Sequence, residues 1–180
     1  MSRIGKAPIT VPSGVEVVIT SDNFATVKGP KGTLEQKLPS GMIIENKDGI
    51  ITVSRPNDNK ENRSMHGLTR TLLNNMIIGV TEQFKKTLEV NGVGYRAAKS
   101  GKTLTLNVGK SHPVTFEETA EISIDVPSPN TIVITGCDKQ KVGAFAANVR
   151  GSRPAEPYKG KGLKYEGERI KRKVGKTGKK

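Results

Sequence analysis

The residues best suited to bind a ligand lie between positions 150 and 180. This segment holds 12 Lys and Arg residues against three Glu, so it carries nine of the thirteen net positive charges of the 180-residue chain. Such a concentration of like charge repels itself unless a polyanion neutralises it. Lysine and arginine bind phosphate groups, and this binding gains free energy from counterion release. A basic segment of this kind admits nucleic acid, an anionic membrane or an acidic protein as its partner. Nucleic acid is favoured, and a membrane would require more bulky apolar residues.

The same segment contains residue types that charge alone does not require. Its glycines let the backbone approach a sugar–phosphate chain and donate N–H groups to it. Tyr158 and Tyr165 could stack on a base or pack on a ribose, and Pro154 and Pro157 stiffen the start of the segment. A merely solubilising tail is the alternative, but it would need neither tyrosine nor proline. We expect phosphate contacts from Arg153, Lys159, Lys161, Lys164, Arg169, Lys171, Arg172 and Lys173.

Candidate catalytic groups are sparse and do not cluster. His66 falls within a predicted helix and His112 precedes a proline, and neither has the spacing of a metal site or a catalytic triad. Both are interpreted as ordinary polar residues. Cys137, next to a predicted helix start, could have a lowered pKa, but a packing role is favoured. The acidic residues within 117–121 are expected on a solvated face.

Two Gly-Lys-Thr triplets, at 101–103 and 175–177, resemble the end of a phosphate-binding loop. Each lacks the earlier glycine of that loop, because the required positions hold Arg96 and Ile170. The pair Gly92 and Gly94 lacks the third glycine of a dinucleotide fingerprint, so a tight turn or a close backbone approach is its expected use. The sequence therefore predicts no catalytic residue, no metal site and no cofactor.

The composition is typical of a reducing, aqueous compartment. A single cysteine allows no internal disulfide. The N-terminus lacks the apolar stretch of a signal peptide, and no window approaches the roughly 18 apolar residues of a spanning helix. We expect a cytoplasmic protein without a membrane partner. Apolar residues make up only 33% of the chain, which predicts a small core or one divided between two modules.

The elements that must position the basic segment are predicted as two similar halves. In the first half, alternating apolar residues predict a strand near residues 15–19. Apolar runs beside the turn signals at 29–32 and 46–49 predict further strands near 24–27, 34–38, 42–45 and 50–53. A helix follows, in which Asp58 is the expected N-cap with Glu61 in a capping box, and Gly79 the expected stop. Its predicted apolar face consists of Met65, Leu68, Leu72, Leu73 and Met76.

The second half is predicted to repeat this order. Strands are predicted at residues 84–90, 95–99, 103–108, 122–126 and 131–135. A second helix follows with Asp138 as its cap, and its apolar face consists of Val142, Phe145, Ala146 and Val149. Residues 51–54 align with 132–135, and residues 27–29 with 90–92, which indicates an internal duplication.

The predicted fold class is α+β. Two small modules, residues 1–82 and 83–150, are each expected to form an antiparallel sheet packed against one helix, with the junction near 79–83. The basic C-terminal tail, residues 151–180, shows no core-forming periodicity. We expect it to be extended and ordered by a partner.

Three stretches resemble one known family. The run 156–165 (Glu-Pro-Tyr-Lys-Gly-Lys-Gly-Leu-Lys-Tyr) is similar to the signature of the bacterial large-subunit ribosomal protein L-six family. The opening residues 2–9 (Ser-Arg-Ile-Gly-Lys-Ala-Pro-Ile) and the segment 90–97 (Val-Asn-Gly-Val-Gly-Tyr-Arg-Ala) resemble it too. The similarity covers nearly the whole chain in order, whereas residues 171–180 are a generic basic run.

The resemblance implies a fold of two similar α+β modules and a structural protein that binds large-subunit rRNA, chiefly through its second module and tail. It also implies a place near the factor-binding region, close to the sarcin–ricin loop and the stalk base. Neighbouring ribosomal proteins there would be partners, and translation factors would be partners by proximity. The rRNA-contact candidates that it carries over are Tyr158, Lys159, Lys161 and Lys164, and more weakly Arg96.

Two other classes of protein compete with this interpretation. An enzyme acting on RNA would use the basic tail to guide substrate, but it requires an acid/base or metal cluster that the spacings do not offer. A free-standing nucleic-acid-binding regulator would not stay with large ribosomal subunits through a high-salt wash. We therefore interpret the chain as a non-enzymatic rRNA-binding ribosomal protein.

Overall fold

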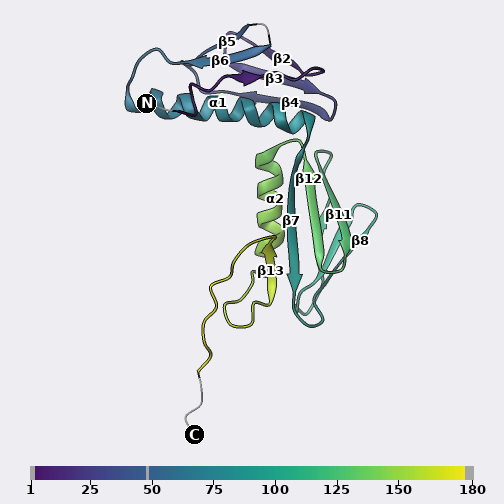
Figure 1. The fold of residues 1–180 in the computed structure, drawn as a ribbon. Coiled ribbons are helices and arrows are strands. Elements are labelled where there is room, and N and C mark those ends of the chain that lie inside the picture. The colour runs from purple at the N-terminus through teal and green to yellow at the C-terminus, as the bar shows by residue number, and fades with distance from the viewer. Residues whose placement is uncertain (1–2, 48, 177–180) are drawn as a thin grey trace. The chain divides into compact units, whose positions relative to one another are not determined.

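A computed structural model describes residues 3–47 and 49–176 (Figure 1). The described residues form two compact units, called the first and second module below. The first module extends to Phe84 and includes Cys137–Lys139, and the second consists of Lys85–Gly136 and the residues from Gln140 onward. Within the described residues, no helix has the length and apolar character needed to cross a membrane.

The first module consists of six strands followed by one long helix (Figure 1). In chain order its elements are β1 (Ile9–Thr10), β2 (Glu16–Ile19), β3 (Phe24–Gly29), β4 (Gly32–Lys37), β5 (Ile43–Lys47), β6 (Ile50–Ser54) and α1 (Lys60–Thr81). Two three-stranded sheets, ordered β1-β6-β5 and β2-β3-β4, replace the single sheet that the sequence predicted, and their pairs are antiparallel.

The hairpin from β3 to β4 forms at the predicted turn, where Gly29 pairs with Gly32 across Pro30-Lys31. The predicted turn at 46–49 includes Asp48, which lies outside the described residues. Strand β1 was missed because two residues give no alternating pattern. Apolar side chains of both sheets and of α1 are buried in one core, among them Ile9, Val27, Ile51, Leu73 and Val80.

The predicted ends of α1 are wrong. Its N-cap is Asn59, which makes no side-chain capping hydrogen bond. Asp58 does not cap the helix because its carboxylate accepts a hydrogen bond from Arg55 Nε at 2.7 Å. Gly79 is not a stop either, because the helix continues to Thr81. A Cβ at Gly79 would lie 2.0 Å from the carbonyl oxygen of Cys137, so close packing explains this glycine.

The predicted buried face of α1 is confirmed at Leu73 and Met76, but it is wrong for the first turns of the helix. Met65 and Leu68 are exposed, whereas His66 and Thr69 are buried beside the apolar core residues of the helix. His66 Nε2 bonds to the carbonyl oxygen of Val53 at 2.8 Å, and Nδ1 lies 2.9 Å from Arg55 Nη1. The apolar pattern missed this face because two of its positions hold polar side chains that find partners inside the module.

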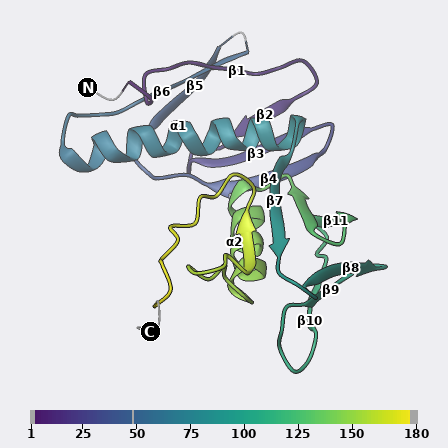
Figure 2. The same ribbon diagram turned by 60° about the horizontal axis from the view of Figure 1, so that its bottom comes forward.

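The second module has the same order of elements and one strand more (Figures 1 and 2). Its elements are β7 (Phe84–Asn91), β8 (Arg96–Ser100), β9 (Thr103–Asn107), β10 (Val114–Glu117), β11 (Ile122–Ser128), β12 (Thr131–Gly136), α2 (Lys139–Gly151) and β13 (Gly162–Tyr165). The strands form two sheets, ordered β10-β9-β8 and β11-β12-β7-β13.

Helix α2 begins directly after Asp138, and its predicted face is confirmed by the buried side chains of Val142, Ala146 and Val149. Strand β10 was not predicted. Its Phe116 makes an edge contact with Phe145 of α2, with 6.1 Å between the ring centroids. Glu118, expected on a solvated face, is only 14% exposed and pairs with Lys99 at 2.7 Å. Its carboxylate also accepts a hydrogen bond from the backbone N–H of Ile124.

The tail was predicted to be extended and to contribute no residue to a core, and this prediction is wrong for residues 162–165. They form β13, which pairs antiparallel with β7, and Leu163 opposite Val90 is completely buried. The apolar pattern gave no sign of this because a single leucine anchors the strand between glycines and lysines. Residues 168–176 contain no helix or strand.

The two modules share one topology, which supports the predicted duplication. The sheet order β1-β6-β5 corresponds to β7-β12-β11, and the order β2-β3-β4 corresponds to β8-β9-β10. The predicted alignment of 51–54 with 132–135 therefore joins equivalent strands, β6 and β12. The alignment of 27–29 with 90–92 is wrong, because it joins β3 to β7, whereas β7 corresponds to β1.

Candidate nucleic-acid interface

The basic loop between α2 and β13 is folded around the side chain of Glu156. The Glu156 carboxylate accepts hydrogen bonds from the backbone N–H of Tyr158 at 2.9 Å, Lys159 at 2.7 Å and Lys161 at 3.5 Å. The N–H of Tyr158 is the main cause that holds the pKa of Glu156 below its usual range. The backbone N–H of Glu156 in turn donates to the carbonyl oxygen of Lys161 at 2.9 Å and closes the loop.

Two glycines permit this loop. Gly160 has a φ of 74°, which side chains rarely adopt. At Gly162 the φ is 131°, and a Cβ would lie 2.6 Å from the carbonyl oxygen of Pro154. This close approach lets the backbone N–H of Leu163 donate to the carbonyl oxygen of Arg153 at 2.8 Å. The Gly-Lys-Gly spacing therefore sets the path of the chain that carries Lys159 and Lys161.

An ion pair fixes the far side of β13. The Arg150 guanidinium donates to Glu168 through Nε at 3.0 Å and through Nη2 at 2.5 Å. The same carboxylate accepts the backbone N–H of Tyr165 at 2.9 Å. Arg150, followed by this backbone N–H, holds the pKa of Glu168 below its usual range. Two of the three acidic residues of the tail thus serve its fold.

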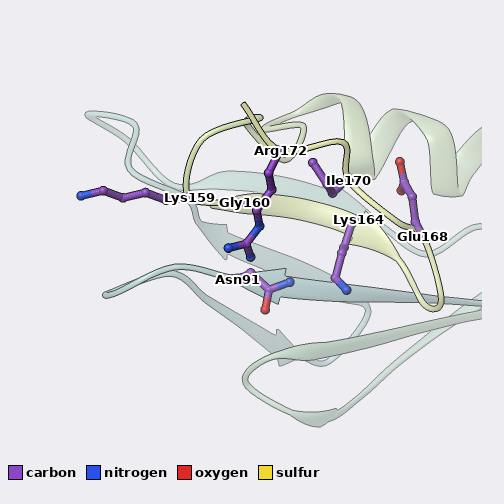
Figure 3. A pocket seen from close by; sticks show the side chains of 7 residues that line it. All are labelled: Asn91, Lys159, Gly160, Lys164, Glu168, Ile170 and Arg172. Carbon is purple, nitrogen blue, oxygen red and sulfur yellow. The ribbon is translucent and has the colours of Figure 1, made fainter. Parts of the chain in front are cut away.

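The predicted contact residues gather around two depressions in the second module. Arg153, Lys159 and Lys161 line one of about 440 Å³, together with Tyr95. The other, of about 270 Å³, is lined by Lys159, Lys164 and Arg172, among others (Figure 3).

The other predicted residues lie apart from these depressions. Arg96 is exposed on β8, and Arg169, Lys171 and Lys173 are exposed on the last segment of the tail. The backbone N–H of Lys173 donates to the carbonyl oxygen of Pro157 at 2.8 Å, so this segment runs back along the basic loop.

The two tail tyrosines differ in their surroundings. The side chain of Tyr158 is exposed, so its ring is open to a ligand. Tyr165 is half-buried, with Lys86 Nζ at 5.8 Å and Arg150 Cζ at 5.6 Å from its ring centroid. These cations occupy positions favourable for cation–π attraction. Tyr158 is therefore the better candidate for stacking on RNA.

Three parts of this surface were missed by the reasoning from sequence. The first is Tyr95, whose side chain packs closely on two glycines. Its ring lies 3.0 Å from where a Cβ at Gly92 would be, and its hydroxyl lies 2.9 Å from where a Cβ at Gly109 would be. Asn91 lines the smaller depression. A third depression of about 340 Å³ is lined by Lys85 and Lys86, among others, and the adjacent lysines were the signal that could have found it.

Lys164 is already paired within the protein. Its ammonium lies 2.7 Å from a carboxylate oxygen of Glu89, the residue opposite it on β7. Among the described residues, no group of His, Cys, Asp and Glu could hold a metal ion. The surface thus combines cations with one exposed ring, a set suited to binding a sugar–phosphate chain.

Comparison with known proteins identifies the family. The sequence profile of the family described as Ribosomal protein L6 matches residues 11–83 and 91–166. The chain belongs to the ribosomal protein L6 family. A relative from Finegoldia magna is 58% identical over 179 residues, which cover 99% of this chain and all of the relative. A relative from Ruminiclostridium cellulolyticum is 59% identical over 178 residues, covering 99% of this chain and 97% of the relative. One from Clostridioides difficile is 54% identical over 180 residues, covering both chains completely.

Each of these relatives bears the name Large ribosomal subunit protein uL6. The resemblance on which the family was inferred from residues 2–9, 90–97 and 156–165 is thereby confirmed. L6 proteins are structural ribosomal proteins and not enzymes, and this chain is one of them.

Proposed function

We propose that this chain is a structural constituent of the large ribosomal subunit and binds large-subunit rRNA through its second module and tail. The observation that carries the proposal is the folded basic loop around Glu156, because it holds Arg153, Lys159 and Lys161 at one depression of the surface. Membership in the L6 family and the names of the relatives support the same assignment. Its place is the ribosome, in the cytoplasm.

The binding mechanism is electrostatic contact with phosphates combined with recognition of shape. The exposed cations of the loop and tail neutralise phosphates, and the displaced counterions increase the affinity. The loop is already folded by its internal hydrogen bonds, so less chain entropy is lost on binding than a disordered tail would lose. Tyr158 is placed to stack on an unpaired base or to pack on a ribose.

The site on the ribosome is proposed from the family resemblance. We place the protein near the factor-binding region, close to the sarcin–ricin loop and the stalk base. Its neighbours there are other ribosomal proteins, and translation factors pass close to it. A footprint on large-subunit rRNA that lies outside this region would contradict the placement and leave rRNA binding itself intact.

The test is a salt titration of binding to purified large-subunit rRNA. We expect the combined change of Lys159, Lys161 and Lys164 to Ala to weaken binding. It should also flatten the slope of log K against log salt by about 0.7–0.9 for each phosphate that the variant no longer neutralises. The matched control replaces three exposed cations of the first module, Lys28, Lys31 and Lys37, by Ala. An unchanged slope in the first variant, or an equal change in both, would refute the proposal.

Cofractionation separates this function from that of a free-standing regulator. A constituent of the subunit stays with large subunits through a high-salt wash, whereas a regulator that binds RNA transiently is released. Release of the wild-type chain under washing that retains other subunit proteins would favour the regulator.

A further inference from the structure

One depression of the second module gathers groups from three separate stretches of chain. It measures about 270 Å³ and is lined by Asn91 at the end of β7, Lys164 on β13, and Gly160 and Arg172 in the tail, among others. Figure 3 shows the side chains of Arg172 and Lys164 directed toward Asn91, whereas Lys159 points away. Two cations and one amide therefore face the same space.

Each of these groups is held in position by the fold. Strand pairing sets Gly162 opposite Asn91 and Lys164 opposite Glu89. The ladder of β7 and β13 therefore fixes the backbone positions from which Asn91 and Lys164 reach the depression. Arg172 is positioned by the hydrogen bond from the next backbone N–H, that of Lys173, to the carbonyl oxygen of Pro157 at 2.8 Å. Its Nη2 lies 3.2 Å from where a Cβ of Gly160 would be, so any side chain at position 160 would crowd the guanidinium.

The charges of the depression leave a net positive site. Glu89 offsets the charge of Lys164 at 2.7 Å, and Arg150 offsets that of Glu168, which also lines the depression. Among the ion pairs of residues 3–47 and 49–176, none includes Arg172. Arg172 and Lys159 both line the depression without an ion pair among these residues, and of the two only Arg172 points toward Asn91 (Figure 3).

We propose that this depression binds a single phosphodiester group of the RNA backbone. Arg172 donates two parallel N–H bonds to the phosphate oxygens, the geometry for which a guanidinium is suited. Lys164 adds a point charge, and the amide of Asn91 donates one further hydrogen bond. This inference rests on the proposed binding of rRNA and makes it specific, because it separates Arg172 from the other cations of the tail.

The experiment compares three neighbouring cations in the full-length protein, with binding to large-subunit rRNA measured across a salt series. We expect R172A to lose about tenfold or more in affinity, since hydrogen bonds to charged groups are the strong ones. K171A and K173A remove the same charge from exposed positions outside the depression, and each should lose about two- to threefold. R172K should recover only part of the affinity, because it keeps the charge but not the parallel donors.

A second variant tests the amide. N91A should weaken binding by about threefold without changing the salt slope, because no charge is lost. Protection of the Lys173 amide from hydrogen exchange serves as the control that the tail of each variant is folded. Equal losses in R172A, K171A and K173A, with rRNA binding of the wild type intact, would overturn the phosphate site alone. Absence of rRNA binding by the wild-type chain would instead overturn the proposed function.

Discussion

The first and second modules have the same order of six strands and a helix, yet their first strands are used differently. In the first module, β1 has two residues and forms the edge of its sheet. In the second, the corresponding β7 has eight residues, and β13 from the C-terminal segment pairs with its other side. The second module thus has the shared fold with one strand, β13, added beside β7, at the sheet edge that β1 forms in the first module.

The added strand explains where the charge is placed. Residues 1–82 hold ten basic and eight acidic residues, whereas residues 150–180 hold 12 basic and three acidic ones. The basic loop leads into β13 and the basic last segment leaves it, so pairing with β7 anchors both to a rigid sheet. A duplicated fold can therefore acquire a binding surface in one copy by extending the chain beyond its last helix.

The largest expected effect comes from truncating one buried leucine in the core of each module. Leu163 on β13 and Leu73 on α1 are both completely buried. We expect L163A and L73A each to destabilise their own module by about 2–5 kcal/mol, the usual cost of this truncation. Only L163A should also reduce rRNA affinity, by at least tenfold, because it releases the strand that anchors the basic loop.

Hydrogen exchange of each module, together with an rRNA-binding titration, provides the measurement. Exchange should rise in the second module of L163A and in the first module of L73A. An equal loss of rRNA affinity in both variants would contradict the assignment of binding to the second module.

A smaller effect compares two Arg–carboxylate pairs. Glu168 is 26% exposed beside Arg150, whereas Asp58 is 81% exposed beside Arg55. In each pair the arginine is the main cause that lowers the pKa of the carboxyl group. A lowered pKa gives stability that is fully present above the unfolded-state value and is lost as the pH falls through the folded-state value.

We expect E168Q to destabilise the second module by about 1–2 kcal/mol at pH 7, because the negative charge is lost and only one oxygen remains to accept from Arg150. It should also flatten the fall in stability below about pH 4.5. The flattening is partial, since Glu118 and Glu156 in the same module also have lowered pKa values. D58N should change neither quantity measurably, because solvent screens an exposed pair. Identical pH profiles for E168Q and the wild type in chemical denaturation would be incompatible with this ion pair.

The sequence predicted most strands and both helices because their patterns are local. Turn signals between apolar runs marked the hairpins β5–β6 and β11–β12, and the spacing of Val142, Ala146 and Val149 marked the buried face of α2. It did not predict β13, because burial of Leu163 depends on β7, about 70 positions earlier in the chain. The face of α1 was misplaced for a related reason, since His66 is buried only where Val53 and Arg55 satisfy its ring.

The candidate site was predicted in composition but not in arrangement. Charge and the run 156–165 identified its cations, yet nothing in the sequence distinguished Arg172, which lines a depression, from Lys171 and Lys173, which do not. The structural role of Glu156 was also missed, because the sequence gives no sign that a carboxylate within a basic run accepts backbone hydrogen bonds. The folded loop brings the backbone N–H groups of Tyr158 and Lys159 to the Glu156 carboxylate, and the sequence does not show this arrangement.

The smallest expected effect concerns Glu89, the acidic residue of β7 that lies opposite Lys164 of β13. Glu89 pairs with Lys164 at 2.7 Å, and a cross-strand pair of this kind contributes about 0.2–1 kcal/mol. We expect E89Q to lose no more than this in stability and to bind rRNA about two- to threefold more tightly, because Glu89 no longer offsets the charge of Lys164. E166Q is the matched control, since it removes the same charge from an exposed tail position outside this pair. If both variants gained affinity equally in the same titration, the gain would reflect net charge alone, and the ion pair with Glu89 would not be what restrains Lys164.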